Sequence, residues 1–277
     1  GINTYIAKYH SNRMMQWLHA SFGVGITSGP FIMTLGISMT SHWQSGYFVV
    51  SIAMGILAVT FFVTKNIWEG ITLNGSKEQN DESEASLMET LKTIPAQLSM
   101  LIFFLYTGME LGLGLWIYSL LTESRGVAPE VAGVVTGSYW AMFTLGRILA
   151  GVYAKKIADS ELIYLSVSFA FLGTALLLTN SGQLTSILGI SVTGFAIAPI
   201  FPGLVSSTTS RVGLRHQANT IGIQMSAASF GIMIVPSLAG VLAKIYGLEV
   251  IPLYLLAVLI LMLLVFVCLD LLSKKTS

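Results

Sequence analysis

The chain has 277 residues, of which 54% are hydrophobic and only 10% are charged, and its mean hydropathy is +0.76. Soluble globular domains carry about 25% charged residues, so this composition excludes a mainly water-exposed surface. The net charge of +1 gives no support for a nucleic-acid partner, and the single cysteine, Cys268, excludes an intramolecular disulfide.

The apolar residues fall into long runs that predict membrane-spanning helices. A helix that crosses the hydrocarbon core needs about 20 mostly apolar residues, and such runs follow one another along the chain. The longest polar break, over residues 65–94, has a charged centre and is expected to be a solvated linker and a domain boundary. The sequence therefore predicts an all-α integral membrane protein of about eight spans, at residues 14–38, 47–64, 95–121, 131–153, 162–179, 184–206, 220–243 and 250–272.

The positive charges predict the orientation of these spans. All but three of the 14 lysines and arginines fall in alternate breaks between the runs. The exceptions are Arg125 and Lys244, in breaks of the opposite set, and Arg147, within a span. Because cytoplasmic loops are enriched in Lys and Arg, the first set is expected in the cytoplasm, together with both ends of this chain and the long loop. The expected location is the plasma (inner) membrane.

Glycines and prolines inside the spans predict close packing and one bend. Gly108-x-x-x-Gly112 allows a neighbouring helix backbone to approach closely. Ala198-Pro-Ile-Phe-Pro202 is expected to kink its helix, since a proline removes a backbone hydrogen bond and clashes with the preceding turn. Both features are compatible with simple packing and with a helix that moves between two states.

Glu110 and Arg147 are ionisable residues that lie well inside predicted spans. A carboxylate at such a depth is costly unless it is paired, protonated or facing water. Glu110 is therefore a candidate proton or substrate site, or one half of a structural ion pair. Arg147 is a candidate partner or gate residue. Counted at about 1.5 Å per residue the two differ in depth, so Arg147 could instead extend towards the cytoplasmic interface.

Other polar and aromatic side chains in the spans are weaker candidates. His19 could take part in proton coupling or gating, or be a packed neutral histidine. Asn219 and Gln224 could hydrogen-bond sugar hydroxyls, or join two helices. Trp116, with Tyr139 and Trp140, could form an aromatic platform for a sugar ring, or be part of the packing.

Known catalytic signatures are absent from the sequence. It contains no His-Glu-x-x-His zinc motif, no phosphate-binding Gly-x-x-x-x-Gly-Lys-Ser/Thr loop and no Gly-x-Ser-x-Gly elbow. We therefore expect no enzyme activity, no metal site and no cofactor, and an ion gradient as the energy source. An enzyme or a non-transporting membrane scaffold remains an alternative class.

Three stretches resemble the major facilitator superfamily, in its fucose-permease-like branch of sugar transporters. The first is Gly1-Ile-Asn-Thr-Tyr followed by Leu18-His-Ala-Ser-Phe-Gly-Val-Gly-Ile-Thr-Ser-Gly-Pro30, and the second is Phe104-Leu-Tyr-Thr-Gly-Met-Glu110 through Trp116-Ile-Tyr. The third is Gly146-Arg147 with Ala198-Pro-Ile-Phe-Pro202. The resemblance implies a fold of twelve helices in two halves, with the substrate between them near mid-membrane. On that plan the chain corresponds to helices 5–12, and helices 1–3 and most of helix 4 are expected to be missing.

The resemblance also implies a division of the chain and a function. Residues 1–64 would be a remnant of the N-terminal half, 65–94 the central cytoplasmic loop, and 95–277 the C-terminal six-helix half. The expected function is proton-coupled transport of a small polar solute, with a sugar as substrate and the bilayer as surroundings. The alternative within transport is a facilitator or exporter of a drug or lipid-like solute.

Overall fold

The structure is a computed structural model that describes residues 2–65, 85–153 and 156–276. Over these ranges the chain is helical and contains no strand, as expected for an all-α integral membrane protein. It divides into two compact units. One is formed by Gly1–Val24 together with Ala85–Ser277, and the other by Gly25–Glu84.

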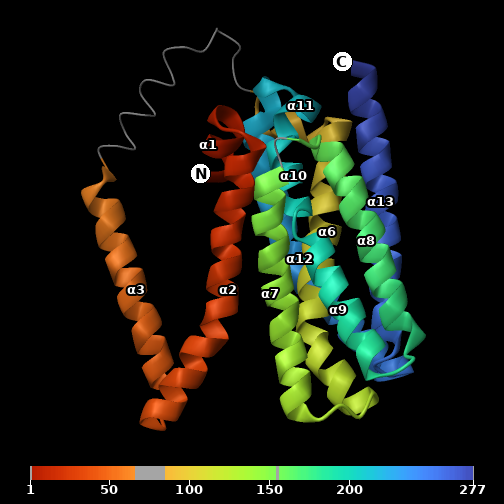
Figure 1. Cartoon of the computed structure of the whole chain (residues 1–277). Helices are drawn as coiled ribbons and strands as arrows, with labels where there is room; N and C mark the ends of the chain where they lie inside the picture. The colour runs from red at the N-terminus through yellow and green to blue at the C-terminus, as the bar shows by residue number, and fades with distance from the viewer. Residues whose placement is uncertain (1, 66–84, 154–155, 277) are drawn as a thin grey trace. The chain divides into compact units, whose positions relative to one another are not determined.

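The larger unit is a helical bundle in which six long helices run alongside one another (Figure 1). The pairs α6 and α12, α8 and α9, α6 and α13, and α7 and α9 pack over the longest stretches. Its elements, in chain order, are α1 (Ile2–Tyr9), the first part of α2 (Asn12–Thr40), α5 (Leu87–Leu91), α6 (Ile94–Ser119), the π-helix η1 (Leu120–Ser124), α7 (Pro129–Tyr153), α8 (Asp159–Thr179), α9 (Gln183–Ile197), α10 (Ile200–Ser206), α11 (Thr208–Val212), α12 (Leu214–Tyr246) and α13 (Val250–Thr276).

The smaller unit consists of the rest of α2 and of α3 (Gln44–Val63), joined by a short turn. The two helices approach closely because both carry glycine at the contact. A Cβ atom added to Gly36 would lie 2.7 Å from the backbone nitrogen of Gly46. Within this unit, Gly46 is the residue of α3 that the contact buries.

Every predicted span coincides with helix in the structure. Six helical segments of the described residues are long and apolar enough to cross a membrane: Gln44–Val63, Ile94–Ser124, Asp159–Thr179, Gln183–Ser206, Leu214–Tyr246 and Val250–Ser273. The two remaining predicted spans coincide with α2, of 29 residues, and α7, of 25 residues. A membrane span requires about 20 residues, and both helices are longer than that.

Part of the long polar loop is ordered on the bundle. Residues 66–84 of the predicted loop at 65–94 lie outside the described residues, whereas α5 lies inside this loop. Its N-cap Ser86 accepts a hydrogen bond from the backbone nitrogen of Glu89 at 3.2 Å, in the Ser-x-x-Glu pattern of a capping box. Glu89 also pairs with Arg215 of α12 at 2.9 Å.

Glycine lets α6 and α12 come into backbone contact, as the spacing of glycines in α6 predicted. A Cβ atom on Gly231 would lie 2.1 Å from the backbone oxygen of Phe104, and one on Gly108 would lie 2.4 Å from Val235. Thr107 strengthens this crossing, because its hydroxyl donates to the backbone oxygen of Ala228 at 2.9 Å. This close crossing positions the centre of α6, where Glu110 lies.

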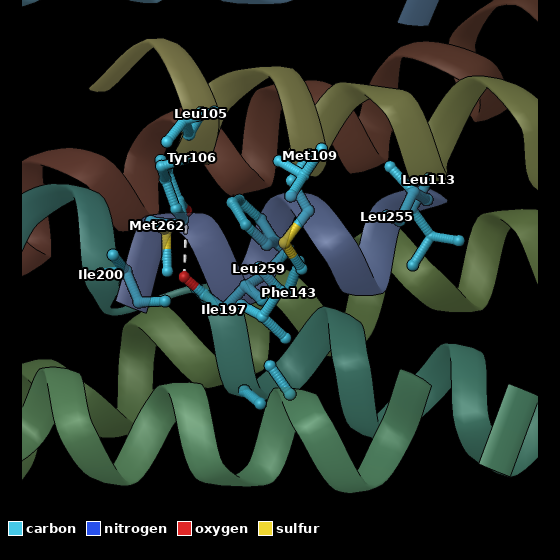
Figure 2. Close-up of a cluster of buried hydrophobic side chains, with 14 of the residues drawn as sticks. Leu105, Tyr106, Met109, Leu113, Phe143, Ile197, Ile200, Leu255, Leu259 and Met262 are labelled. Carbon is cyan, nitrogen blue, oxygen red and sulfur yellow. Dashed lines mark hydrogen bonds between the residues drawn. The ribbon is translucent and has the colours of Figure 1, made fainter. Parts of the chain in front are cut away.

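The core of the bundle gathers side chains of several helices around α6 and α13 (Figure 2). Tyr106 contributes its ring to this cluster, and its hydroxyl donates to the backbone oxygen of Ile197 at 2.9 Å. The other labelled members are apolar: Leu105, Met109, Leu113, Phe143, Ile197, Ile200, Leu255, Leu259 and Met262. A packed apolar core thus surrounds the few polar groups in the middle of the bundle.

Candidate functional site

Glu110 lies in the middle of α6, and its side chain is only 5% exposed. Two contacts hold this part of α6 against α7. The hydroxyl of Tyr139 donates to the backbone oxygen of Glu110 at 2.8 Å. The indole of Trp140 lies so close to Gly114 that a Cβ atom there would meet it at 2.4 Å. The carboxyl group of Glu110 is therefore held opposite the side chains of α7.

Arg147 of α7 is the cation that meets this carboxyl group. Its side chain is 2% exposed, and Nη2 lies 3.9 Å from Oε2 of Glu110. Nη1 donates to the backbone oxygen of His19 at 3.1 Å. The guanidinium also lies over the ring of Phe143, 4.1 Å from its centroid. Arg147 thus pairs with Glu110 inside the bundle and does not extend to the interface, which was the alternative in the sequence analysis.

The expected kink is a complete break between α9 and α10. Pro202 has no N–H to donate to the backbone oxygen of Ala198, four residues earlier. Three successive carbonyl groups at the break, those of Ile197, Ala198 and Pro199, accept hydrogen bonds from side chains of other helices. The donors are Tyr106 Oη of α6 at 2.9 Å, Arg147 Nε of α7 at 3.2 Å and Gln16 Nε2 of α2 at 3.3 Å.

Glu110 and Arg147 line a cavity of about 300 Å³ together with residues of α2, α10 and α12. His19 lies on its wall, with its ring 4.8 Å from the ring of Phe201. The remaining lining is mostly apolar and consists of Phe22, Thr107, Leu111, Phe201, Met225, Ala228, Ser229 and Ile232. The structure therefore brings Glu110, Arg147 and His19 together at one cavity, although they are far apart in the sequence.

The other three candidates lie in helix contacts outside this cavity lining. Trp116 Nε1 donates to the backbone oxygen of Pro236 at 3.1 Å. Asn219 Nδ2 donates to the backbone oxygen of Ala85 at 2.7 Å and so joins α12 to the segment before α5. Gln224 Nε2 donates to the hydroxyl of Thr208 at 3.0 Å. Their contribution to substrate binding stays a prediction. In the structure each side chain hydrogen-bonds a residue of another segment of the chain.

The polar groups around the break were not among the residues predicted from the sequence. Tyr106 and Gln16 were not singled out, because a tyrosine or glutamine in an apolar run has no distinguishing pattern. Arg147 was noticed for its charge, but not as a donor to Ala198. A usable signal was present, since Pro202 leaves the oxygen of Ala198 without its usual donor and requires another group to satisfy it.

A second charged cluster lies where α8 begins, beside α11 and the end of α13. A cavity of about 420 Å³ is lined there by Asp159, Arg211 and Asp270 and by four serines. Asp159 accepts hydrogen bonds from Asn12 and, at 2.8 Å, from Ser206. Burial lowers the pKa of Arg211, which the two nearby carboxylates oppose. The hydrogen bonds to Asp159 join α2, α8 and α10 at one end of the bundle.

A third charged cluster surrounds Arg125, just after η1. Its guanidinium makes a bidentate pair with Glu249, Nε to Oε1 at 2.9 Å and Nη2 to Oε2 at 2.7 Å. It also donates to Ser186 Oγ at 2.7 Å and to the backbone oxygen of Leu177 at 2.8 Å. The hydrogen bonds from Arg125 hold the pKa of Glu249 below its usual range.

Metal and thiol chemistry find no support in the described part of the chain. Within it, no three His, Cys, Asp or Glu residues lie close enough together to hold a metal ion. Cys268 is exposed and is not in a disulfide.

The sequence profile of the Major Facilitator Superfamily matches residues 2–190 and 98–277. The chain is 24% identical to bypass of stop codon protein 6 of Saccharomyces cerevisiae, over 88% of this chain and 55% of that protein. It is 24% identical to human sodium-dependent glucose transporter 1, over 84% of this chain and 50% of that transporter. It is 23% identical to the glucose/mannose transporter GlcP of Bacillus subtilis, over 85% of this chain and 59% of that transporter.

The fold is similar to that of a solved transporter of the same superfamily. The crystal structure of FucP in the outward conformation superimposes with a TM-score of 0.59 and 16% identity, covering 82% of this chain and 56% of that one. The chain spans about half the length of the curated relatives it matches.

Proposed function

Because the chain belongs to the major facilitator superfamily, we propose that it takes part in ion-coupled transport of a sugar by alternating access. Members of this superfamily are transporters and not enzymes, in agreement with the expectation from the missing catalytic motifs. The chain is a multi-pass membrane protein. The observation that carries the proposal is the buried pair of Glu110 and Arg147 on the wall of a cavity.

Glu110 is the proposed coupling group. A buried ion pair is retained at the expense of desolvating both charges, and in a membrane such a pair marks a pathway for ions or substrate. A proton on Glu110 removes its negative charge and releases Arg147 from the pair. Because Arg147 also donates to the α9–α10 break and to α2, that release loosens the link between α6, which carries Glu110, and these segments. Proton binding and helix movement are thereby linked.

A sugar is the proposed substrate on two grounds. The relatives named as glucose or glucose/mannose transporters cover most of this chain. The cavity of about 300 Å³ is at the lower end of the range for ligand pockets, about 300–1,000 Å³, which suits a single sugar ring. A drug-like or lipid-like solute is the second candidate, favoured by the apolar residues Phe22, Leu111 and Ile232 in the lining.

The proposed arrangement in the membrane follows the distribution of positive charge. Residues 1–64 form the end of the N-terminal half, 65–94 the central loop and 95–277 the C-terminal half. Both ends of the chain and the central loop face the cytoplasm, and the membrane is the plasma (inner) membrane. Accessibility of single cysteines placed at the exposed positions Lys92 and Lys244 to an impermeant thiol reagent would test this orientation, with Cys268 replaced by Ser.

The proposal is tested by uptake of radiolabelled glucose and mannose into vesicles that contain the protein expressed from its full coding sequence. An inward proton gradient and an inward sodium gradient are imposed separately, since one relative is named sodium-dependent. We expect gradient-driven accumulation by the wild type, and its loss in Glu110→Gln with retention of sugar exchange at equal ion concentrations. Glu123→Gln changes an exposed acid and is the matched control.

Three outcomes would change the proposal in different ways. Accumulation by Glu110→Gln equal to that of the wild type would remove Glu110 from coupling. Accumulation driven only by sodium would replace the proton with Na⁺. An absence of sugar uptake by the wild type would favour the drug-like or lipid-like solute.

A further inference from the structure

His19 has a feature that the ion-coupling role of Glu110 and Arg147 does not use. It lines the cavity from α2, and its ring packs on Phe201 of α10 at 4.8 Å between centroids. Its backbone oxygen accepts from Arg147 at 3.1 Å. Its side-chain Nε2 atom is buried and has no hydrogen-bond partner among the described residues. The residue is thus held in place by its backbone and its ring face, while one ring nitrogen is left over.

A buried polar atom without a partner is unusual in a folded protein. The large majority of buried side-chain polar atoms are hydrogen-bonded, and an exception is explained by strain, a functional role or a bound water or ion. At a residue that lines a cavity, a bound ligand can supply the missing partner. The free-energy cost of leaving this atom unpaired is removed when such a ligand binds. Nε2 of His19 is therefore placed as a recognition atom for whatever occupies the cavity.

The surroundings of His19 define the chemistry of that ligand. The two charged groups of the lining, Glu110 and Arg147, already face each other, so the cavity carries no net charge that would call for an ionic ligand. Among the described residues, no cluster of three His, Cys, Asp or Glu side chains could hold a metal ion here. The aromatic rings of Phe22 and Phe201 offer apolar faces on which the C–H face of a sugar ring can lie. A neutral polyhydroxy ring meets both requirements.

We infer that Nε2 of His19 hydrogen-bonds one hydroxyl group of the transported sugar and thereby sets which sugars are accepted. A hydroxyl group donates and accepts, so it can pair with Nε2 in either tautomer of the imidazole. The inference rests on the proposed function and adds the recognition of a specific hydroxyl to it. In this assignment His19 acts on the substrate, whereas Glu110 acts on the ion.

Two variants separate the hydrogen bond from the packing of the ring. His19→Phe keeps a flat ring against Phe201 and removes the nitrogen. His19→Gln gives up the ring but places an amide near the position of Nε2. Neither change alters the backbone oxygen that accepts from Arg147. If His19 only packs against Phe201, His19→Phe should affect transport less than His19→Gln. If Nε2 binds the sugar, His19→Gln should affect transport less than His19→Phe.

The measurement is the KM for uptake of glucose and of its 2-, 3-, 4- and 6-deoxy derivatives by the wild type and both variants. We expect one deoxy derivative to have a KM about fivefold to tenfold above that of glucose in the wild type, the effect of losing one neutral hydrogen bond. In His19→Phe glucose and that derivative should have equal KM values. In His19→Gln the discrimination should return in part.

The outcomes distinguish this inference from the proposed function. Unchanged discrimination among the deoxy derivatives in His19→Phe would overturn the role of His19 while leaving sugar transport intact. Loss of gradient-driven accumulation in His19→Phe, with unchanged discrimination and unchanged sugar exchange, would assign His19 to ion coupling instead. A wild type that takes up none of the five sugars would overturn both the inference and the proposed substrate class.

Discussion

Arg125 and Arg147 are both almost completely buried, with side chains 4% and 2% exposed, yet they are bound in different ways. Arg125 makes two short hydrogen bonds to one carboxylate and two more to a serine and a backbone oxygen. Arg147 approaches its carboxylate only to 3.9 Å, beyond the usual length of a hydrogen bond. Its two other bonds go to the backbone oxygens of α2 and of the α9–α10 break.

This difference separates a fixed contact from one that can change. All the donor groups of Arg125 that reach Glu249, Ser186 and Leu177 do so at 2.9 Å or less, so little is gained by any rearrangement. The pair of Arg147 and Glu110 is longer and lies beside a cavity, so a proton or a ligand can compete for the carboxyl group. Burial of an arginine alone therefore does not distinguish the two, whereas the length of the ion pair and its place on a cavity wall do.

The largest effect that would test this comparison is expected from Arg147→Lys. A lysine keeps the charge but lacks the planar fork of donors, so it cannot reach Glu110, Ala198 and His19 together. Loss of two hydrogen bonds from a charged donor, each worth about 1.5–3 kcal/mol, corresponds to a decrease in transport rate of about 100-fold or more. Initial rates of sugar uptake into vesicles measure it.

The matched control is Arg125→Lys. We expect this variant to transport at close to the wild-type rate, because Arg125 does not line the cavity of Glu110. A variant Arg147→Lys that transports normally, or an Arg125→Lys that abolishes transport in a folded protein, would reverse the roles assigned to the two arginines.

The next effect concerns stability and comes from Arg125→Met, which keeps the length of the side chain and removes all its donors. Removing one partner of a buried pair costs about 3–5 kcal/mol. The side chain of Glu249 is 39% exposed and its carboxylate regains water, so we expect a smaller loss than this range, about 2–3 kcal/mol. That corresponds to a melting temperature lower by about 5–10 °C in detergent. A change below about 2 °C would contradict a stabilising role for this cluster.

The sequence predicted the helices well because their signal is local. Each predicted span is an apolar run of sufficient length, and each coincides with helix in the structure. A kink at Ala198–Pro202 was predicted for the same reason, since Pro199 and Pro202 disrupt a helix whatever surrounds it, and the structure has a break there. Close packing at Gly108 likewise follows from the absence of a side chain.

The site was predicted only in part because its partners come from distant segments. Counting residues along α6 and α7 gave Glu110 and Arg147 different depths, whereas the structure brings their side chains within 3.9 Å. A count along one helix contains no information on how the next helix is shifted or tilted. The pair of Arg125 and Glu249 joins residues 124 positions apart and has no local signature.

The same limit explains why Asn219 and Gln224 were singled out for substrate binding. A polar side chain in an apolar helix needs a partner, but the sequence does not tell a ligand from another helix. The structure gives Asn219 the backbone oxygen of Ala85 and gives Gln224 the hydroxyl of Thr208. His19 differs from both, because its Nε2 atom has no such partner among the described residues.

The smallest effect is the pH dependence of the Arg125 cluster. The hydrogen bonds from Arg125 hold the pKa of Glu249 below its usual value of 4.5. Its contribution to stability is therefore complete above about pH 4.5 and is lost as the pH falls through the lowered pKa in the folded state. Because the carboxylate is partly exposed, we expect less than about 1 kcal/mol, or a decrease of roughly 2–3 °C in melting temperature.

Melting temperatures of the wild type and of Glu249→Gln, measured from pH 7 down through the acidic range below the usual pKa of a carboxylate, isolate this contribution. The wild type should be the more stable of the two at pH 7, and the difference should shrink as the pH falls, because the neutral glutamine cannot titrate. Glu123→Gln should keep the wild-type dependence. Parallel curves for the wild type and Glu249→Gln would mean that Arg125 is held by Ser186 and Leu177 alone. The contrast with Arg147 would then rest on backbone and hydroxyl acceptors and no longer on the strength of an ion pair.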